Sequence, residues 1–521
     1  MGKQSFIKGT MILLAAGIIN RILGFIPRIT LPRVIGAEGV GLYQMGWPFL
    51  VVILTVITGG LPIAIAKLVA EAEAERNEAR IRSILGISLS VVLFLSTLFT
   101  AACLIAAPWI TSHLLTDKRV YYTFLCMSPI IPIVGISAVF RGYFQGRQDM
   151  IPTATSQIAE TLVRIVMVLV FAYLMLPYGI EYAAAGAMIG VTTGELCGML
   201  ILWIHYKLSK KRSPSPAKAM IGTSKAKSRK SNLRRILGIS LPVTGSRLVG
   251  AGSYLLESIL IAQSLALAGV TTALATAQYG ALQGMVIPIL LLPSALTYSL
   301  SVSLVPSLSE AAARKDIVTI HKRLHQSIRL ALVTGAPFAV IMFVLAEPLC
   351  KFMYNQPEVG IMLKMMAPIA MFIYLQAPLQ ATLQALDKPG DALINTLIGS
   401  TVKLLLIYWL ASKPEVGIRG AIIAINVNIV LVTILHWSSV ARLLKFHMQS
   451  LDFLKVGAAM IISGFGIYAA MYTPWIEREL IRFTAACLLG LTIYLILSIL
   501  FRLVNRSDFT RIMRLGKKVI R

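Results

Sequence analysis

Residues 129–145 read PIIPIVGISAVFRGYFQ, and residues 368–384 read PIAMFIYLQAPLQATLQ. A single offset of about 239 residues aligns polar or turn-forming residues that are scarce in this chain: Pro129 with Pro368, Gln145 with Gln384, Arg164 with Lys403 and Glu71 with Glu310. Apolar similarity alone would align one aliphatic residue with another, not these. The sequence therefore predicts two parallel repeats, an arrangement typical of two-lobed membrane transporters.

The composition assigns the chain to a membrane. Hydrophobic residues make up 57% and charged residues 14%, and the mean hydropathy is +0.78. Only helices and closed barrels satisfy their own backbone in lipid, and the apolar runs are too long for barrel strands. We expect about fourteen helical spans, near 8–32, 41–66, 83–107, 121–144, 153–176, 183–206, 236–268, 277–303, 328–350, 363–385, 392–412, 418–437, 453–474 and 481–501.

The expected fold is an all-α polytopic membrane protein with two six-helix repeats and two further helices. We place the N-terminal lobe at 1–206, a basic linker at 207–235, the C-terminal lobe at 236–437 and the last two spans with a basic tail at 438–521. Six spans separate equivalent points of the repeats, so both lobes have the same orientation in the membrane. We therefore expect a cleft to open between the two lobes.

Positive charge predicts the orientation. Residues 207–235 contain about eleven Lys or Arg and no acid, and such loops remain in the cytoplasm. An even number of spans then places both termini in the cytoplasm. The net charge of +27 is explained by this topology. A nucleic-acid partner is not expected, because no aromatic residues are interleaved with the basic run.

Neither a metal site nor an enzyme is expected. All five cysteines lie in apolar spans without a Cys-x-x-Cys pair, so we interpret them as packing residues. No Walker A loop, paired Asp motif or large outer loop supplies a catalytic constellation. No cofactor is expected, and a sodium ion or a proton is the candidate coupling ion.

Four arginines are candidate ligands of an anionic headgroup. Polar residues inside spans cost a few kcal/mol unless they face protein or water. Arg21, Arg28 and Arg33 lie in or at the end of the first span, and Arg247 lies in the seventh, where the repeat matches it to Arg21. Guanidinium groups suit the oxygens of a pyrophosphate. The alternatives are snorkelling for Arg21 and Arg247 and interfacial anchoring for Arg33.

Three acids in the spans are candidates for ion coupling. Glu160 and Arg164 are four residues apart on one helix face, which fits either an internal ion pair or a coupling site. Glu195 and Glu257 have no obvious local partner, so each either packs as a buried carboxyl or binds a proton or sodium ion.

Several motifs resemble the MurJ-type lipid II flippases of the multidrug/oligosaccharidyl-lipid/polysaccharide superfamily. These are Arg21-Ile22-Leu23-Gly24-Phe25, Arg33-Val34-Ile35-Gly36-Ala37 and Leu304-Val305-Pro306-Ser307-Leu308-Ser309. The motifs Gly9-Thr10-Met11-Ile12-Leu13, residues 36–43 and residues 140–146 are similar to a sporulation-associated branch of that family. The chain departs from the family pattern at Gly280-Ala281, where charge is usual.

The resemblance implies a fourteen-helix flippase in a bacterial cell membrane. Its expected cargo is a polyprenyl-pyrophosphate-linked saccharide, with lipid II for spore cortex peptidoglycan as the leading candidate, and its expected partners are cell-wall synthesis or sporulation proteins. The family's sodium site would lie near Glu257, Asn395 and Asn426. Two alternatives remain: a multidrug or cation antiporter, which would favour buried acids without several arginines, and a non-transporting scaffold for sporulation.

Overall fold

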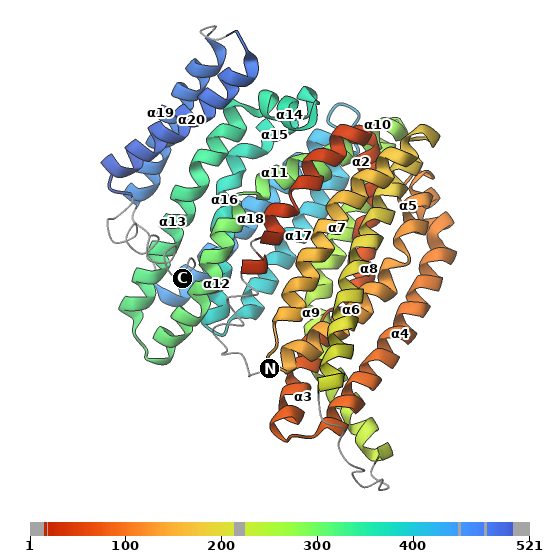
Figure 1. The fold of residues 1–521 in the computed structure, drawn as a ribbon. Coiled ribbons are helices and arrows are strands. Elements are labelled where there is room, and N and C mark those ends of the chain that lie inside the picture. Colours follow the sequence, from red (N-terminus) through yellow and green to blue (C-terminus); the bar gives the residue numbers. More distant parts are fainter. Residues whose placement is uncertain (1–14, 18, 213–224, 446–449, 474–476, 504–521) are drawn as a thin grey trace. The chain divides into compact units, whose positions relative to one another are not determined.

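The computed structural model describes residues 15–17, 19–212, 225–445, 450–473 and 477–503 as helices joined by short turns (Figure 1). No strand occurs in these ranges, which agrees with an all-α fold. Contacts divide the chain into two units. Unit 1 comprises Met1–Gly284 and Ser412–Ile418, and unit 2 comprises Met285–Ala411 and Arg419–Arg521.

Unit 1 is a bundle of long helices in which α7 and α8 pack most extensively against each other. A shorter contact joins α10 to α2. Its helices are α2 (Ile26–Thr58), α3 (Leu61–Ala74), α4 (Glu78–Trp109), α5 (Val120–Met127), α6 (Ile130–Gly146), α7 (Ile151–Met175), α8 (Ile180–Arg212), α9 (Lys225–Leu267) and α10 (Thr272–Gly280).

Unit 2 has a core in which α13 packs against α16 and α19. The π-helical segment η3 (Ala281–Val286) leads into it from unit 1. Its helices are α11 (Ile287–Leu291), α12 (Ser294–Ala313), α13 (Ile317–Val344), α14 (Ala346–Tyr354), α15 (Gly360–Met366), α16 (Ala370–Ala385), α17 (Pro389–Ala411), α18 (Ile418–Leu444), α19 (Ser450–Tyr472) and α20 (Glu479–Leu500).

The predicted number of spans agrees with the structure once one long helix is divided. Thirteen helices in the described ranges are long and apolar enough to cross a membrane. The first, Ala15–Ala74, has 60 residues, too many for one crossing of a core about 30 Å thick. Gly36 breaks it with φ 65° and ψ −177°, a conformation that favours glycine. Two crossings separated at Gly36 account for fourteen spans.

The predicted span 277–303 is not one continuous helix. Its first part ends at Leu291 in α11, and α12 begins at Ser294. Pro288 and Pro293 lie in this region, and each lacks the backbone N–H that a continuous helix would use. The proline positions therefore explain the break.

The two repeats share their helix ends. Positive φ angles of 51° to 59° recur at the offset that aligns the repeats, in the non-glycine pairs Arg76 and Lys315, Thr116 and Asn355, and Gln148 and Asp387. The next residues after the first pair, Asn77 and Asp316, each cap a helix by accepting from a backbone N–H, at 2.9 Å from Arg80 and 3.0 Å from Thr319. The backbone thus repeats where the side chains have diverged.

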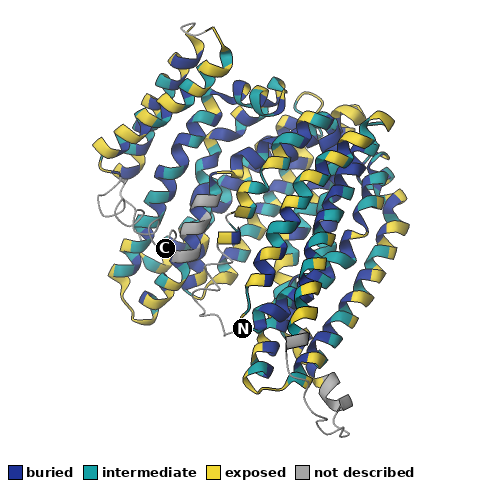
Figure 2. Cartoon of the chain, viewed as in Figure 1, coloured by how far each residue is buried: buried dark blue, intermediate teal, exposed yellow. Residues whose placement is uncertain are grey.

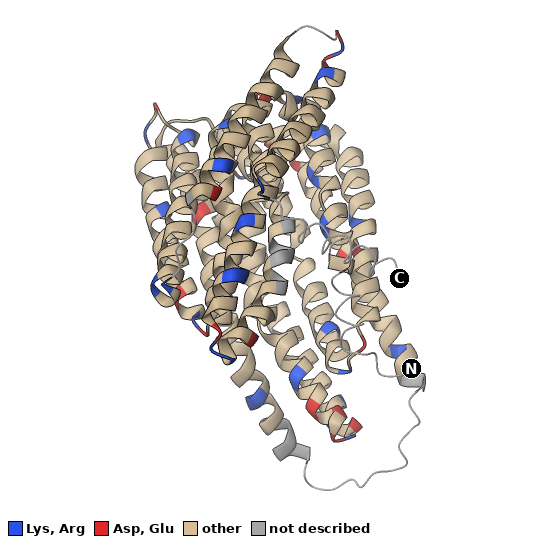
Figure 3. Ribbon diagram, turned by 90° about the vertical axis from the view of Figure 1, so that its left-hand side faces the viewer, with Lys and Arg blue, Asp and Glu red and all other residues tan. Residues whose placement is uncertain are grey.

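The outer surfaces of several helices are apolar. Figure 2 shows exposed positions along α4, α19 and α20, and these include Ile105, Phe465 and Ile499, each at least 67% exposed. Charged residues interrupt the helices at few positions (Figure 3). Such surfaces suit lipid rather than water. The protein is a multi-pass membrane protein.

The helices differ in two respects from the expected domain boundaries. The predicted linker 207–235 is helical at both ends, because α8 continues to Arg212 and α9 begins at Lys225; residues 213–224 and most of the predicted tail lie outside the described residues. The contacts also group α9 and α10 with unit 1, since α9 packs along α2, α3 and α4. The repeat-based lobes remain a prediction.

Candidate functional site

Three helices of unit 1 bring polar side chains together inside apolar spans. The hydroxyl of Tyr43 on α2 interacts electrostatically with Arg28 of the same helix and with Arg164 of α7. Tyr254 of α9 interacts with Glu257, Arg28 and Tyr43. We name these five residues the interior polar face. It joins two arginines, two tyrosines and one glutamate from elements far apart in the sequence.

The break at Gly36 helps to form this face. Arg28 lies before the break in α2 and Tyr43 lies after it. Pro27 stands in the first turn of α2, where its missing N–H costs little, and Pro32 lies inside the helix. The changed helix direction at Gly36 lets the two segments contribute to one polar cluster.

A carboxylate cluster adjoins the interior polar face on α7 and α8. Glu160 accepts hydrogen bonds at 2.8 Å from Nη2 of Arg141 and at 3.2 Å from Nη1 of Arg164. The same Nη1 lies 3.6 Å from Oε1 of Glu195. The side chains of Glu160 and Glu195 are 10% and 14% exposed. Two acids and two guanidinium groups therefore balance one another inside the bundle.

Two glycines of α8 make room for this cluster. A Cβ at Gly194 would lie 2.7 Å from the Cβ of Arg164, and one at Gly198 would lie 3.2 Å from Oε2 of Glu160. Any side chain there would push α8 away from α7. The two glycines thus hold Glu195 within reach of its partner on α7.

Glu257 belongs to a second set of buried hydrogen bonds. Its Oε1 accepts a bond of 2.8 Å from Nε2 of Gln283, and the Tyr279 hydroxyl donates to Oγ of Ser258 at 2.9 Å. All four side chains are buried. These bonds connect α9 to α10 and η3 beside the interior polar face.

The four predicted ligands of the headgroup, Arg21, Arg28, Arg33 and Arg247, are all exposed. Arg247 precedes Tyr254 by seven residues on α9, which places it on the same helix face about 10 Å along the axis. Arg28 joins the interior polar face through its electrostatic interactions with Tyr43 and Tyr254.

Asn395 and Asn426 lie in unit 2 and have different partners. Nδ2 of Asn395 is 3.2 Å from Nδ1 of His436 and donates to Ser439 at 2.9 Å. Nδ2 of Asn426 donates to the Met365 carbonyl at 3.0 Å. Ten residues of α18 separate Asn426 from His436, about 15 Å along a helix. The described contacts therefore do not bring the two amides together.

A polar network joins α2, α10 and the turn before α5 at one end of unit 1. Arg119 donates to Asp117 at 2.9 Å and to Glu38 at 2.6 Å, and Thr276 of α10 donates to Asp117 at 2.8 Å. The hydrogen bond that Arg119 donates to Asp117 is the main cause that raises the pKa of Arg119, so its guanidinium stays charged. We name these four residues the end network.

Sequence reasoning missed Arg141, Tyr43 and Tyr254. Arg141 is nineteen residues from its partner Glu160 and on another helix, beyond the range of an i,i+4 pattern. In the sequence, Tyr43 and Tyr254 do not differ from other aromatic residues of apolar spans, so nothing marks them as functional. Only the place of Arg141 inside an otherwise apolar span could have marked it.

Known proteins resemble the chain along its whole length. The polysaccharide biosynthesis protein family matches residues 6–312, and the MatE family matches residues 251–409. Stage V sporulation protein B of Bacillus subtilis (strain 168) is 43% identical over 523 residues, 100% of both chains. Lipid II flippase MurJ of the same organism is 25% identical over 419 residues, 77% of both chains.

Solved structures share the fold. The inward closed conformation of lipid II flippase MurJ has a TM-score of 0.71 at 17% identity and covers 94% of this chain and 99% of its own. An inward-facing multidrug resistance MATE transporter has a TM-score of 0.63 at 16% identity, covering 83% and 95%. The chain belongs to the polysaccharide biosynthesis protein family and is a membrane transporter of the multidrug/oligosaccharidyl-lipid/polysaccharide (MOP) superfamily.

Proposed function

We propose that this transporter moves a polyprenyl-pyrophosphate-linked saccharide across the membrane, with lipid II for cell-wall or spore peptidoglycan as the leading cargo. The full-length similarity to stage V sporulation protein B and the similarity to lipid II flippase MurJ support this substrate class. Partners in cell-wall synthesis or sporulation would supply and receive such a lipid.

Arg28 is the observation on which the substrate rests. No acid among the described residues forms an ion pair with it, although it lies in a membrane span. A guanidinium in such a place costs a few kcal/mol unless an anion or water compensates it. Together with Arg164, which also interacts with Tyr43, it suits the oxygens of a diphosphate. A cation substrate would be repelled there.

The coupling ion that we assign is a proton, taken up by the cluster of Glu160 and Glu195. Both carboxylates lie within 3.6 Å of the Arg164 guanidinium, and Arg141 also bonds to Glu160. Two guanidinium groups leave little attraction for a metal cation at these oxygens. Protonation of one carboxylate would free Arg164 to bind a second anion, which links proton uptake to the headgroup.

The predicted two-repeat architecture supports transport by alternating access. The end network then acts within unit 1 as a contact that holds α10 against α2 and the turn before α5. The basic residues of 207–212 lie on α8 and those of 225–235 on α9, and we assign both segments to the cytoplasm together with both termini.

Reconstituted transport of labelled lipid II tests this proposal. Purified protein in liposomes should accelerate the appearance of the headgroup on the far leaflet. Loss of one charge-assisted hydrogen bond of about 1.5–3 kcal/mol predicts that Arg28→Ala slows this by about tenfold or more. Arg314→Ala, at an exposed arginine paired with Glu310, serves as the matched control.

Two outcomes would contradict the proposal. Wild-type protein that never accelerates headgroup transfer, under any proton or sodium gradient, would exclude a lipid II flippase. Export of a cationic dye that Arg28→Ala enhances would favour the antiporter instead. For the coupling ion, Glu195→Gln should remove the dependence on a pH gradient, and a remaining dependence on sodium alone would exclude the proton.

A further inference from the structure

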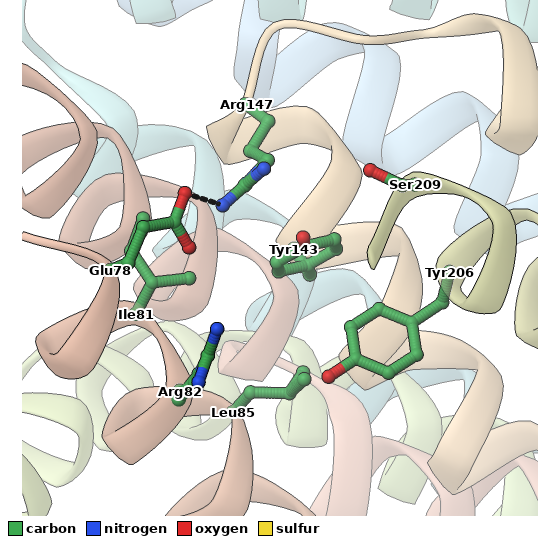
Figure 4. A pocket seen from close by; sticks show the side chains of 8 residues that line it. All are labelled: Glu78, Ile81, Arg82, Leu85, Tyr143, Arg147, Tyr206 and Ser209. Carbon is green, nitrogen blue, oxygen red and sulfur yellow. Dashed lines mark hydrogen bonds and ion pairs between the residues drawn. The ribbon is translucent and has the colours of Figure 1, made fainter. Parts of the chain in front are cut away.

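A pocket outside the interior polar face lies where α4, α6 and α8 end together. Figure 4 shows it from close by, and all its residues belong to unit 1. Its lining consists of two arginines, one glutamate, two tyrosines, one serine and two aliphatic residues: Glu78, Ile81, Arg82, Leu85, Tyr143, Arg147, Tyr206 and Ser209. Nothing in the transport proposal uses these residues.

The charges of the pocket leave one positive group available. Arg147 forms an ion pair with Glu78 and lies 3.5 Å from Glu73, so its charge is already compensated. Arg82 is exposed and has no ion pair or hydrogen bond among the described residues. The lining therefore carries one uncompensated guanidinium, which favours an anion.

Three hydroxyl groups line the same pocket as that guanidinium. The hydroxyls of Tyr143, Tyr206 and Ser209 have no hydrogen-bond partner among the described residues, and Figure 4 shows Arg82, Tyr206 and Ser209 directed into the space between the three helices. The ring of Tyr206 is held edge-on to Tyr143 at 5.4 Å and beside Phe140 at 5.4 Å. Fixed rings preset the hydroxyl donor and reduce the entropy lost on binding.

The pocket lies at the level of a membrane surface. The apolar spans begin at Glu78 and end at Gly146 and Ser209, the residues that border it. One turn before Tyr206, Trp203 stacks under the Lys207 ammonium at 3.9 Å from the ring centroid. Tryptophan, tyrosine and lysine in this combination are typical of helix ends at the lipid headgroups.

We propose that this pocket binds the phosphate of an anionic phospholipid headgroup. Arg82 supplies the opposite charge, and Tyr206 and Ser209 donate hydrogen bonds to the phosphate oxygens. Ile81 and Leu85 form an apolar wall against the glycerol end of the lipid. The bound lipid would connect α4 to α8 at the end of unit 1 that carries the basic segments, where an anionic leaflet attracts positive residues.

Native mass spectrometry of the full-length protein provides the test. The protein is released from phosphatidylcholine nanodiscs that contain increasing phosphatidylglycerol, and retained phosphatidylglycerol is counted. Wild type should retain it, and Arg82→Gln should weaken retention by at least about tenfold. Arg234→Gln, which removes an exposed charge of α9 outside the pocket, should leave it unchanged.

A second variant and a second ligand keep the test independent of folding. Tyr206→Phe preserves the ring packing and removes only the hydroxyl, so it should weaken retention less than Arg82→Gln but measurably. If Arg82→Gln and Arg234→Gln weaken the retention of phosphatidylglycerol equally, the lipid is held by general surface charge and the proposal is overturned. Displacement of the lipid by millimolar inorganic phosphate would instead assign the pocket to a soluble anion and also overturn it.

Discussion

Replacement of Glu160 by Gln should destabilise the protein by about 3 kcal/mol. The change leaves Arg141 without its carboxylate at 2.8 Å, while Arg164 keeps Glu195 at 3.6 Å. Breaking a buried ion pair costs about 3–5 kcal/mol because one charge remains uncompensated. The remaining contact to Glu195 places the expected cost at the lower end of that range.

Unfolding by SDS in mixed micelles, followed by tryptophan fluorescence, measures this change. The pair Glu310 and Arg314 has the same i,i+4 spacing on α12 but is at least 58% exposed. Its Glu310→Gln variant should change the unfolding free energy by less than about 0.5 kcal/mol. A double-mutant cycle of Glu160→Gln with Arg141→Gln should show a coupling of about 1–3 kcal/mol, since the two side chains share one network.

If Glu160→Gln lowers the unfolding free energy no more than Glu310→Gln does, the ion pairs of Glu160 do not stabilise the protein. Such a result would mean that water enters the cluster and screens its charges, so that α7 and α8 are not held together by it. If both single variants are destabilised but the coupling energy between Glu160 and Arg141 is negligible, the 2.8 Å contact is not the cause of the destabilisation.

Three further predictions concern helix packing, capping and the end network. Gly280→Ala would overlap the backbone of α2 and should destabilise the protein by about 1–3 kcal/mol, whereas Gly250→Ala enters open space and should not. Asp316→Ala should accelerate hydrogen exchange at the Thr319 amide, and Asp316→Asn should not. The hydrogen bond from the Thr319 hydroxyl lowers the pKa of Asp316 in the folded protein. The stabilisation by this cap is therefore fully present above the ordinary Asp pKa of about 4 and is lost as the pH falls through the lowered pKa of the folded state. Arg119→Gln leaves a buried carboxylate poorly compensated and should lower the unfolding free energy by more than about 1 kcal/mol in the same SDS assay.

The fold could be predicted because its signals are long and redundant. Apolar runs give the spans, and matches such as Pro129 with Pro368 give the repeat. The break between Leu291 and Ser294 was harder, because a proline kink and a proline break look the same in a sequence. The grouping of α9 with unit 1 depends on long-range packing that no local pattern records.

The site was less predictable because its partners come from different helices. The i,i+4 pair of Glu160 and Arg164 forms as its spacing indicates. Glu195, which has no local partner in the sequence, meets Arg164 across α7 and α8 because Gly194 makes room. Helical periodicity shows which residues share a face, but it does not show which two faces meet.

The repeated left-handed turns at Arg76 and Lys315, at Thr116 and Asn355, and at Gln148 and Asp387 have an evolutionary consequence. If one ancestral half was duplicated, no net insertion or deletion has been retained between these left-handed turns since then, because the spacing of all three turns is the same in both repeats. The residue types diverged at the same time, so that Glu160 in the first repeat aligns with Gly399 in the second. The two repeats should therefore be exchangeable. A chimera in which residues 77–148 replace residues 316–387 should keep all three left-handed turns while it moves Arg141 of the carboxylate cluster into the second repeat.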